Sequence, residues 1–251
     1  MVRSVRGKTI RGGGERGDAW HKAAMRDKRQ VSYDDFIAVT ESLIRIGFTS
    51  PAKLGVFGSS IGGLLAATLG TERPDLCGAV VSDVPLTDML RYPEMGMGAA
   101  WMDEHGDPKD PKYQPVLRSY SPFHNVKEGV KYPPFFIAVS SQDNRVGPGH
   151  ARKLAARLEQ VHAPVYFFED SEGRHGVSDA LERPDLMALR MTFLINNLMG
   201  GHLDSVVRIN HRWHSRGDSR DEARNYPTRL FWSERTLETV LSDLPGASRM
   251  P

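Results

Sequence analysis

The sequence predicts an α/β fold with a mostly parallel sheet and flanking helices, and three observations support this. Short apolar runs alternate with longer amphipathic ones between residues 33 and 199, which is the pattern of strands and helices in such folds. A glycine-rich turn at 58–63 separates the first apolar run from a run of good helix formers. The 251 residues suffice for one substantial domain, and for a second only if both are small.

The elements follow in chain order. Phe36, Val39, Leu43 and Ile44 recur at helical spacing, which predicts a helix over 33–46. Segment 91–133 is richer in Pro, Gly, Asp and Tyr, so we expect a long excursion with short helices, of the kind that often caps an active site. The other predicted elements are strands over 54–58, 78–82, 135–140 and 164–168, and helices over 61–70, 148–160 and 183–199.

The composition indicates an ordinary soluble protein. The chain has 33 Lys and Arg against 31 Asp and Glu, and a net charge of +2 is too weak to indicate a nucleic-acid or membrane partner. Its single cysteine, Cys77, excludes an internal disulfide framework and a cysteine-rich zinc site. No run reaches the roughly 20 apolar residues of a membrane helix, and the first residues lack the apolar region of a signal peptide. We therefore expect a cytoplasmic protein.

Residues 201–251 differ from the rest of the chain, because they contain eight Arg and no Lys. On a helix the regular arginine spacing would form a basic stripe, but Gly217 interrupts it, Asp218 and Glu222 partly neutralise it, and Pro227 follows. We therefore predict a poorly ordered tail in preference to a nucleic-acid-binding helix. The arginines that repeat every fourth residue are Arg208, Arg212, Arg216, Arg220 and Arg224.

Two adjacent serines lie in the glycine-rich turn, and the nucleophile-elbow pattern G-x-S-x-G distinguishes them. With Ser60 in the centre, Gly58 and Gly62 fill both glycine positions, whereas with Ser59 in the centre neither position is glycine. Glycines avoid clashes in this sharp strand-to-helix turn. A hydroxyl there lies at a helix N-terminus, whose dipole and free N–H groups favour developing negative charge. Ser60 is therefore the predicted nucleophile.

A nucleophilic serine needs a base, and the base needs an acid that orients it. In α/β-hydrolase folds the chain order is serine, acid and histidine, with the last two on loops after later strands. Asp143 follows the predicted strand 135–140, and His175 follows the predicted strand 164–168. This combined placement predicts a triad of Ser60, Asp143 and His175 on an α/β-hydrolase fold.

The chain resembles the prolyl oligopeptidase family of serine peptidases, and specifically the catalytic domain of that family. The resemblance covers roughly residues 10 to 199 and rests on several blocks that occur in order. It implies the same three catalytic residues, with no metal and no cofactor. The blocks include TSPAKLGVFGSSIGG (49–63), RPDLCGAVVSDVPLTDMLRY (73–92), WMDEHGDP (101–108) and DNRVGPGHARK (143–153).

The resemblance also implies contacts to the substrate. Family members prefer to cut after proline, whose ring stacks on a tryptophan, and Trp101 falls at the matching place. Arg145 matches an arginine that binds the peptide substrate by hydrogen bonds. The backbone N–H of Ile61, the residue after the nucleophile, would be one oxyanion donor. Taken alone, Trp101 would indicate core packing and Arg145 a surface salt bridge.

Parts of the family pattern are missing from this sequence. Family members carry a large β-propeller, and their catalytic domains have further strands before the block at 10–21, with a tyrosine that supplies half of the oxyanion hole. We therefore expect a partial α/β-hydrolase domain over 1–200, from a truncated gene product, and the Arg-rich tail over 201–251. Missing strands would leave an open sheet edge, so self-association through that edge is a further expectation.

The sequence thus predicts a serine endopeptidase that cleaves small peptides after proline through an acyl-enzyme. Loss of one oxyanion donor costs about 3 kcal/mol, or about a hundredfold in rate, so we expect residual hydrolysis if the fold holds. Two alternatives stay open from sequence: an esterase of relaxed specificity, and a catalytically impaired remnant that acts only through an exposed surface.

Overall fold

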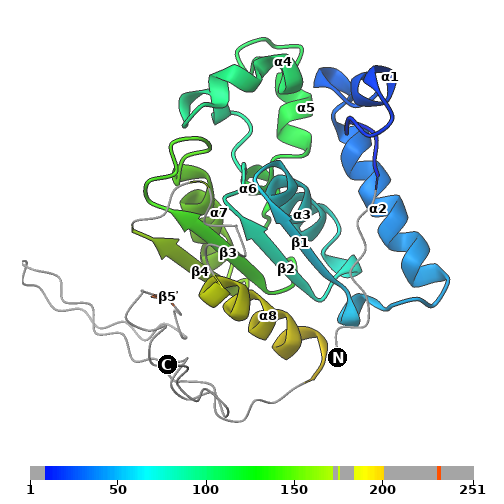
Figure 1. The fold of residues 1–251 in the computed structure, drawn as a ribbon, viewed down its shortest axis with the longest axis vertical. Helices are drawn as coiled ribbons and strands as arrows, with labels where there is room; N and C mark the ends of the chain where they lie inside the picture. The colour runs from blue at the N-terminus through cyan, green and yellow to red at the C-terminus, as the bar shows by residue number, and fades with distance from the viewer. Residues whose placement is uncertain (1–8, 172–174, 176–183, 201–230, 233–251) are drawn as a thin grey trace, which may run out of the picture.

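The computed structural model describes residues 9–171, 175, 184–200 and 231–232. Within these residues the strands form one five-stranded sheet, in which every neighbouring pair is parallel and the spatial order follows the chain order (Figure 1). No helix of the described residues is long and apolar enough to cross a membrane. The strands are β1 (Gly55–Ser59), β2 (Ala79–Asp83), β3 (Phe135–Ser140), β4 (Val165–Asp170) and β5 (Phe231–Trp232).

The strands and helices expected between residues 33 and 199 are all present, with small shifts of their ends; the helix expected over 33–46, for example, is Gln30–Arg45. The α-helices are α1 (Asp18–Lys22), α2 (Gln30–Arg45), α3 (Ile61–Glu72), α4 (Met102–His105), α5 (Gln114–Ser119), α6 (Pro122–Asn125), α7 (Gly149–Gln160) and α8 (Pro184–Leu198). The 3-10 turns are η1 (Arg26–Lys28), η2 (Pro51–Lys53), η3 (Pro74–Leu76), η4 (Tyr92–Glu94) and η5 (Gly98–Trp101).

Strand β5 was not predicted from the sequence. It lies within the segment expected to be a poorly ordered tail and pairs with β4, with Phe167 opposite Phe231. The remainder of that segment, including its arginine repeat, lies outside the described residues.

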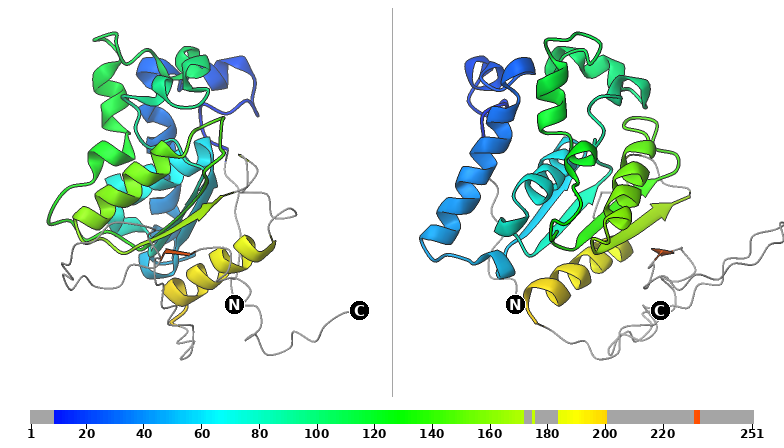
Figure 2. Two further views of the ribbon diagram at one scale, coloured as in Figure 1. Left: turned by 90° about the vertical axis from the view of Figure 1, so that its left-hand side faces the viewer. Right: turned by 180° about the vertical axis from the view of Figure 1, so that it is seen from behind.

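Both faces of the sheet are covered, which explains why the central strands are continuously apolar. All residues of β2 and β3 are buried. Because successive side chains point to opposite faces, Val80 and Ile137 pack with α3 and α7, whereas Val81 and Phe136 pack with Phe193 of α8. Among the described long helices, α8 lies on one side of the sheet and the others lie on the opposite side (Figure 2).

Strand β1 is the edge of the sheet in the described part of the chain. It pairs with β2, and the ring of Phe57 in its centre is 49% exposed. Two large apolar side chains of α8, Met191 and Ile195, are also exposed, as is Met199 directly after the helix. The described residues therefore leave apolar side chains exposed on β1, the strand that precedes the predicted nucleophile, and on α8.

The excursion between β2 and β3 forms a cap over one end of the sheet, beside α1 and the start of α2 (Figure 1). Its core is a separate apolar cluster, in which Tyr33 of α2 stacks on Tyr120 of the cap with ring centroids 4.8 Å apart. Glu104 of the cap pairs with His21 and with the buried Arg29. These contacts attach the cap to the N-terminal segment that includes α1 and α2. Because the cap begins directly after β2, it lies at the carboxyl end of the parallel strands, which is where α/β folds place ligands.

Candidate active site

Ser60 lies in the turn between β1 and α3, in a backbone conformation that few non-glycine residues adopt. Its φ is 58° and its ψ is −119°. Glycines make this turn possible, because a Cβ at Gly58 would lie 1.9 Å from the carbonyl oxygen of Gly62. A Cβ at Gly63 would lie 2.7 Å from the carbonyl oxygen of Asp83, whereas one at Gly62 would meet open space. The glycines that the packing requires are therefore Gly58 and Gly63, and the motif alone did not single out the second.

Ile61 is the first residue of α3. The first N–H groups of a helix have no partner within the helix, so the N–H of Ile61 is available to a ligand. The Ile61 side chain is exposed. This position fits the oxyanion donor expected from the sequence.

Asp143 lies in the loop after β3 and is buried. Its Oδ1 accepts hydrogen bonds from the backbone N–H groups of Arg145 and Val146, each at 3.0 Å. Burial alone would raise the pKa of this carboxyl, but the hydrogen bonds from His175 and the two backbone groups outweigh it and hold the pKa below its usual value. Asp143 is therefore ionised at neutral pH.

His175 joins the acid to the serine. Its Nδ1 lies 2.9 Å from Oδ2 of Asp143, and its Nε2 lies 3.1 Å from Oγ of Ser60. An ionised carboxylate can only accept, so the neutral imidazole carries its proton on Nδ1 and its Nε2 accepts the serine proton. The structure thus brings together the three residues of the predicted triad, which lie far apart in the sequence.

Of the two predicted substrate-binding residues, Arg145 lies two residues after Asp143 and Trp101 lies in the cap. Arg145 has an exposed side chain, and its backbone oxygen accepts the N–H of Met97 from the cap at 2.6 Å. No ion pair engages its guanidinium within the described residues. Trp101 is half-buried and packs against the apolar cluster of the cap. Neither side chain forms a hydrogen bond with the triad in the described part of the chain.

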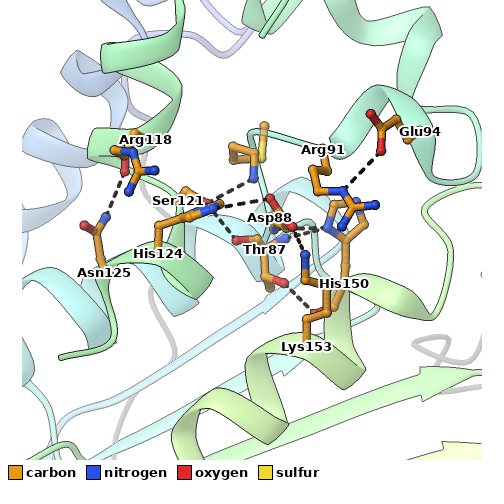
Figure 3. A network of polar contacts seen from close by, with 11 residues as sticks. Thr87, Asp88, Arg91, Glu94, Arg118, Ser121, His124, Asn125, His150 and Lys153 are labelled. Carbon is orange, nitrogen blue, oxygen red and sulfur yellow. Dashed lines mark hydrogen bonds and ion pairs between the residues drawn. The ribbon is translucent and has the colours of Figure 1, made fainter. Parts of the chain in front are cut away.

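A buried polar network that the sequence did not predict connects the cap to α7 (Figure 3). Fully buried Asp88 pairs with Nζ of Lys153. Nδ1 of His150 accepts the N–H groups of Thr87 and Asp88, each at 3.1 Å, and burial lowers the pKa of His150 to about 4. The available sequence signal is Asp88 itself, which interrupts the apolar run at 84–90.

Ser121 extends this network to the other end of the cap. Its Oγ lies 3.0 Å from the carbonyl oxygen of Thr87 and 2.8 Å from Nδ1 of His124. Nε2 of His124 lies 3.8 Å from Oδ1 of Asp88. Because α7 begins directly after the loop of Asp143, the network ties both ends of the cap to the segment that holds the acid.

The described residues include no candidate metal centre. Among them, no group of three or more His, Cys, Asp or Glu side chains converges as ligands would.

Comparison with known proteins identifies the family. The model of the prolyl oligopeptidase family matches residues 8–201. The chain belongs to the prolyl oligopeptidase family. The resemblance noted from the sequence blocks and the expected α/β-hydrolase fold are therefore confirmed.

Individual members of the family show how much of the pattern is present. The uncharacterised peptidase y4nA of Sinorhizobium fredii is 47% identical over 191 residues, which cover 76% of this chain and 26% of that protein. The prolyl endopeptidase of Dictyostelium discoideum is 38% identical over 180 residues, covering 69% and 24%. The solved post-proline cleaving enzyme of Rickettsia typhi has a TM-score of 0.73 at 43% identity, covering 76% and 28%. The chain therefore spans about a quarter of the length of these family members.

Proposed function

We propose that this chain is a serine peptidase that cleaves small peptides after proline through an acyl-enzyme. The hydrogen-bonded series from Ser60 Oγ to His175 Nε2 and from His175 Nδ1 to Asp143 carries the proposal, with distances of 3.1 and 2.9 Å. A serine hydroxyl is a weak nucleophile unless an oriented base takes its proton. Membership of the family supports the same assignment.

In the proposed reaction, Nε2 of His175 takes the hydroxyl proton while Oγ of Ser60 bonds to the carbonyl carbon of the scissile peptide. The carbonyl electron pair moves onto the oxygen, which the N–H of Ile61 stabilises. Protonated His175 then gives its proton to the leaving amine as the C–N bond breaks. Water repeats these steps on the acyl-enzyme and releases the acid and free Ser60. Asp143 keeps His175 in the reactive tautomer and stabilises its cation.

Cleavage after proline is the finer part of the proposal. The relatives include a prolyl endopeptidase and a post-proline cleaving enzyme, and Trp101 lies in the cap. We expect the Trp101 indole to stack on the proline ring and the exposed Arg145 guanidinium to bind a substrate carbonyl. Contact between a saturated ring and an apolar surface contributes about 0.8 kcal/mol for each CH₂ group that it removes from water. Trp101→Ala should therefore reduce the kcat/KM preference for proline over alanine at the cleaved position by about three- to tenfold.

Reaction with a fluorophosphonate probe tests the proposed nucleophile. We expect the wild type to be labelled and Ser60→Ala to be unlabelled. Ser59→Ala is the matched control, because it removes the neighbouring hydroxyl and should leave labelling intact. Absence of labelling in folded wild-type protein would contradict a serine hydrolase and favour a non-catalytic role.

Two substrates then separate a peptidase from an esterase. Turnover of an N-blocked Gly-Pro anilide that is lost in Ser60→Ala supports the proposed peptidase. Turnover of nitrophenyl acetate without turnover of the anilide would indicate an esterase of relaxed specificity instead.

A further inference from the structure

A fully buried ion pair lies beneath the nucleophile turn. Nη2 of Arg190, on α8, is 2.7 Å from Oδ2 of Asp83, the last residue of β2, and neither side chain is exposed. Removing two charges from water costs free energy that their attraction often fails to recover. Oδ1 of Asp83 also accepts no hydrogen bond from the described residues. Stability alone is therefore a poor explanation for this pair.

Asp83 also holds the backbone of the predicted nucleophile. Its carbonyl oxygen accepts a hydrogen bond from the N–H of Ser60 at 2.8 Å, and it lies opposite Ser59 in the parallel register. The positive φ of Ser60 costs a non-glycine residue about 1–3 kcal/mol, so this conformation persists only where surrounding contacts fix it. The peptide group of Asp83 is one of those contacts.

The edge position of β1 increases the importance of this contact. Within the described residues β1 has a hydrogen-bonded neighbour on one side, which is β2. The guanidinium of Arg190 lies over the ring of Phe57 on β1, 5.9 Å from its centroid. Arg190 therefore lies against both strands that support the nucleophile turn.

Arg190 also connects the nucleophile to the part of the chain that follows the base. Helix α8 is the first helix after His175 among the described residues, and it crosses the sheet face below β1 and β2 (Figure 1). The ion pair anchors this helix to the end of β2. It therefore restrains the strand end beside Ser60 relative to α8.

We propose that Asp83 and Arg190 are positioning residues, which hold Ser60 within hydrogen-bond reach of His175 through the Asp83 peptide group. This role rests on the proposed function, because it concerns the reaction of Ser60. Both side chains are fully buried, so they act through the backbone and not by contact with the substrate. The ion pair fixes the Asp83 side chain. It thereby also fixes the orientation of the Asp83 backbone carbonyl, which accepts the hydrogen bond from the N–H of Ser60.

Kinetics of ion-pair variants test this role. Arg190→Met removes the cation but keeps much of the side-chain volume. Because loss of the ion pair should displace Ser60, we expect kcat for an N-blocked Gly-Pro anilide to fall by about 10- to 100-fold. KM should change by less than about threefold. Arg190→Lys keeps the charge and should retain more of kcat. Arg73→Met is the control, because it breaks the pairs of Arg73 with Glu41 and Asp75 outside this turn.

Amide hydrogen exchange gives a readout that does not depend on activity. In Arg190→Met, exchange over 55–64 should accelerate by about tenfold or more, while exchange in α7 stays unchanged. Equal acceleration in both segments would indicate a purely structural pair and overturn the proposal, as would unchanged exchange with unchanged kcat. If the wild type does not react with a fluorophosphonate but exchange rises only over 55–64, the backbone role holds and the proposed hydrolase function fails.

Discussion

At the scale of single residues, burial and hydrogen bonding decide which polar side chains carry charge. His105 is buried in the cap with Nδ1 3.2 Å from the hydroxyl of Tyr120, and burial lowers the pKa of His105 to about 3. Burial lowers the pKa of His150 as well. Asp143 is also buried, but its hydrogen bonds outweigh the burial and keep its pKa low. The same burial thus leaves two histidines neutral and the acid of the triad ionised.

The neutral state of His105 predicts a loss of stability in mild acid. An unfolded histidine has a pKa of about 6.5, so below that pH the unfolded chain binds a proton that native His105 does not bind. The free energy of unfolding should therefore fall by about 1.4 kcal/mol per pH unit from this group, or about 2 kcal/mol between pH 7 and 5. Urea unfolding at pH 7 and pH 5 measures this fall in the free energy of unfolding. In His105→Asn the fall should be about 2 kcal/mol smaller than in the wild type. His162→Asn, at an exposed histidine, should keep the wild-type drop.

The identities of the triad residues could be predicted from sequence because each follows an apolar run at the carboxyl end of a strand. The contacts that fix them could not. Asp83 and Arg190 are separated by more than 100 residues, and only the folded sheet shows that they meet beneath Ser60. The direction of the Trp101 side chain could not be predicted either. Its sequence position places it in the cap but does not specify which side of the cap its ring covers.

At the scale of elements, α3 must approach β2 closely for Ser60 to reach its position. Ser82 Oγ donates a hydrogen bond to the carbonyl oxygen of Gly63 at 2.8 Å, which joins the strand to the first turn of the helix. Further along α3, a Cβ at Gly70 would lie 2.6 Å from the ring of Phe135. Small residues on one face of α3 therefore set its distance from the sheet.

The glycine pair at the start of α3 provides a direct comparison. Gly63→Ala places a Cβ 2.7 Å from the carbonyl oxygen of Asp83, so we expect a loss of about 1–3 kcal/mol in the free energy of unfolding. Gly62→Ala meets open space and removes a flexible residue from a helix, so it should be neutral or stabilising by up to about 1 kcal/mol. Urea unfolding of both variants checks this, and equal destabilisation by the two substitutions would contradict it.

The attachment of the cap to α7 gives another prediction at this scale. Lys153→Met leaves the buried Asp88 carboxylate without the Lys153 cation. Breaking a fully buried ion pair lowers the free energy of unfolding by about 3–5 kcal/mol. Because Lys153 is 29% exposed, we expect a smaller loss of about 2 kcal/mol. Arg152→Met is the matched control on the same helix. It breaks an exposed pair with Glu169 and should cost less than about 1 kcal/mol. Thermal unfolding measures both losses, and adding Asp88→Asn to Lys153→Met should recover stability.

Element positions were predictable where periodicity and length agree, as in α2 and β3. The cap was predictable only as a segment rich in Pro and Gly, because its short helices depend on contacts with distant residues such as Tyr33 and Lys153. A helix of four residues such as α4 has too few positions for a periodic pattern to show. Its place is set by the pairing of Glu104 with Arg29.

At the scale of the whole molecule, the sheet is covered on both faces but open along β1 in the described residues. A parallel sheet normally has both faces covered, and an exposed apolar edge strand is a template for pairing with another chain. The five residues of β1 carry no charge and no proline, which are the usual features that block such pairing. Self-association through this edge, expected from the sequence, remains a prediction.

We propose that the partner at this edge is a second copy of the chain, and paired variants at two phenylalanines test it. Phe57 lies in the centre of β1 and is 49% exposed. Phe48 lies before the strand and is 48% exposed, so the two residues are almost equally exposed but only Phe57 is in β1. The weight-average mass of the wild type should rise above 28.0 kDa with concentration in sedimentation experiments. Phe57→Lys should suppress the rise, because a charge on an edge strand opposes pairing, and Phe48→Lys should not. Equal suppression by both variants would indicate nonspecific apolar contact, and a concentration-independent mass in the wild type would contradict pairing at β1.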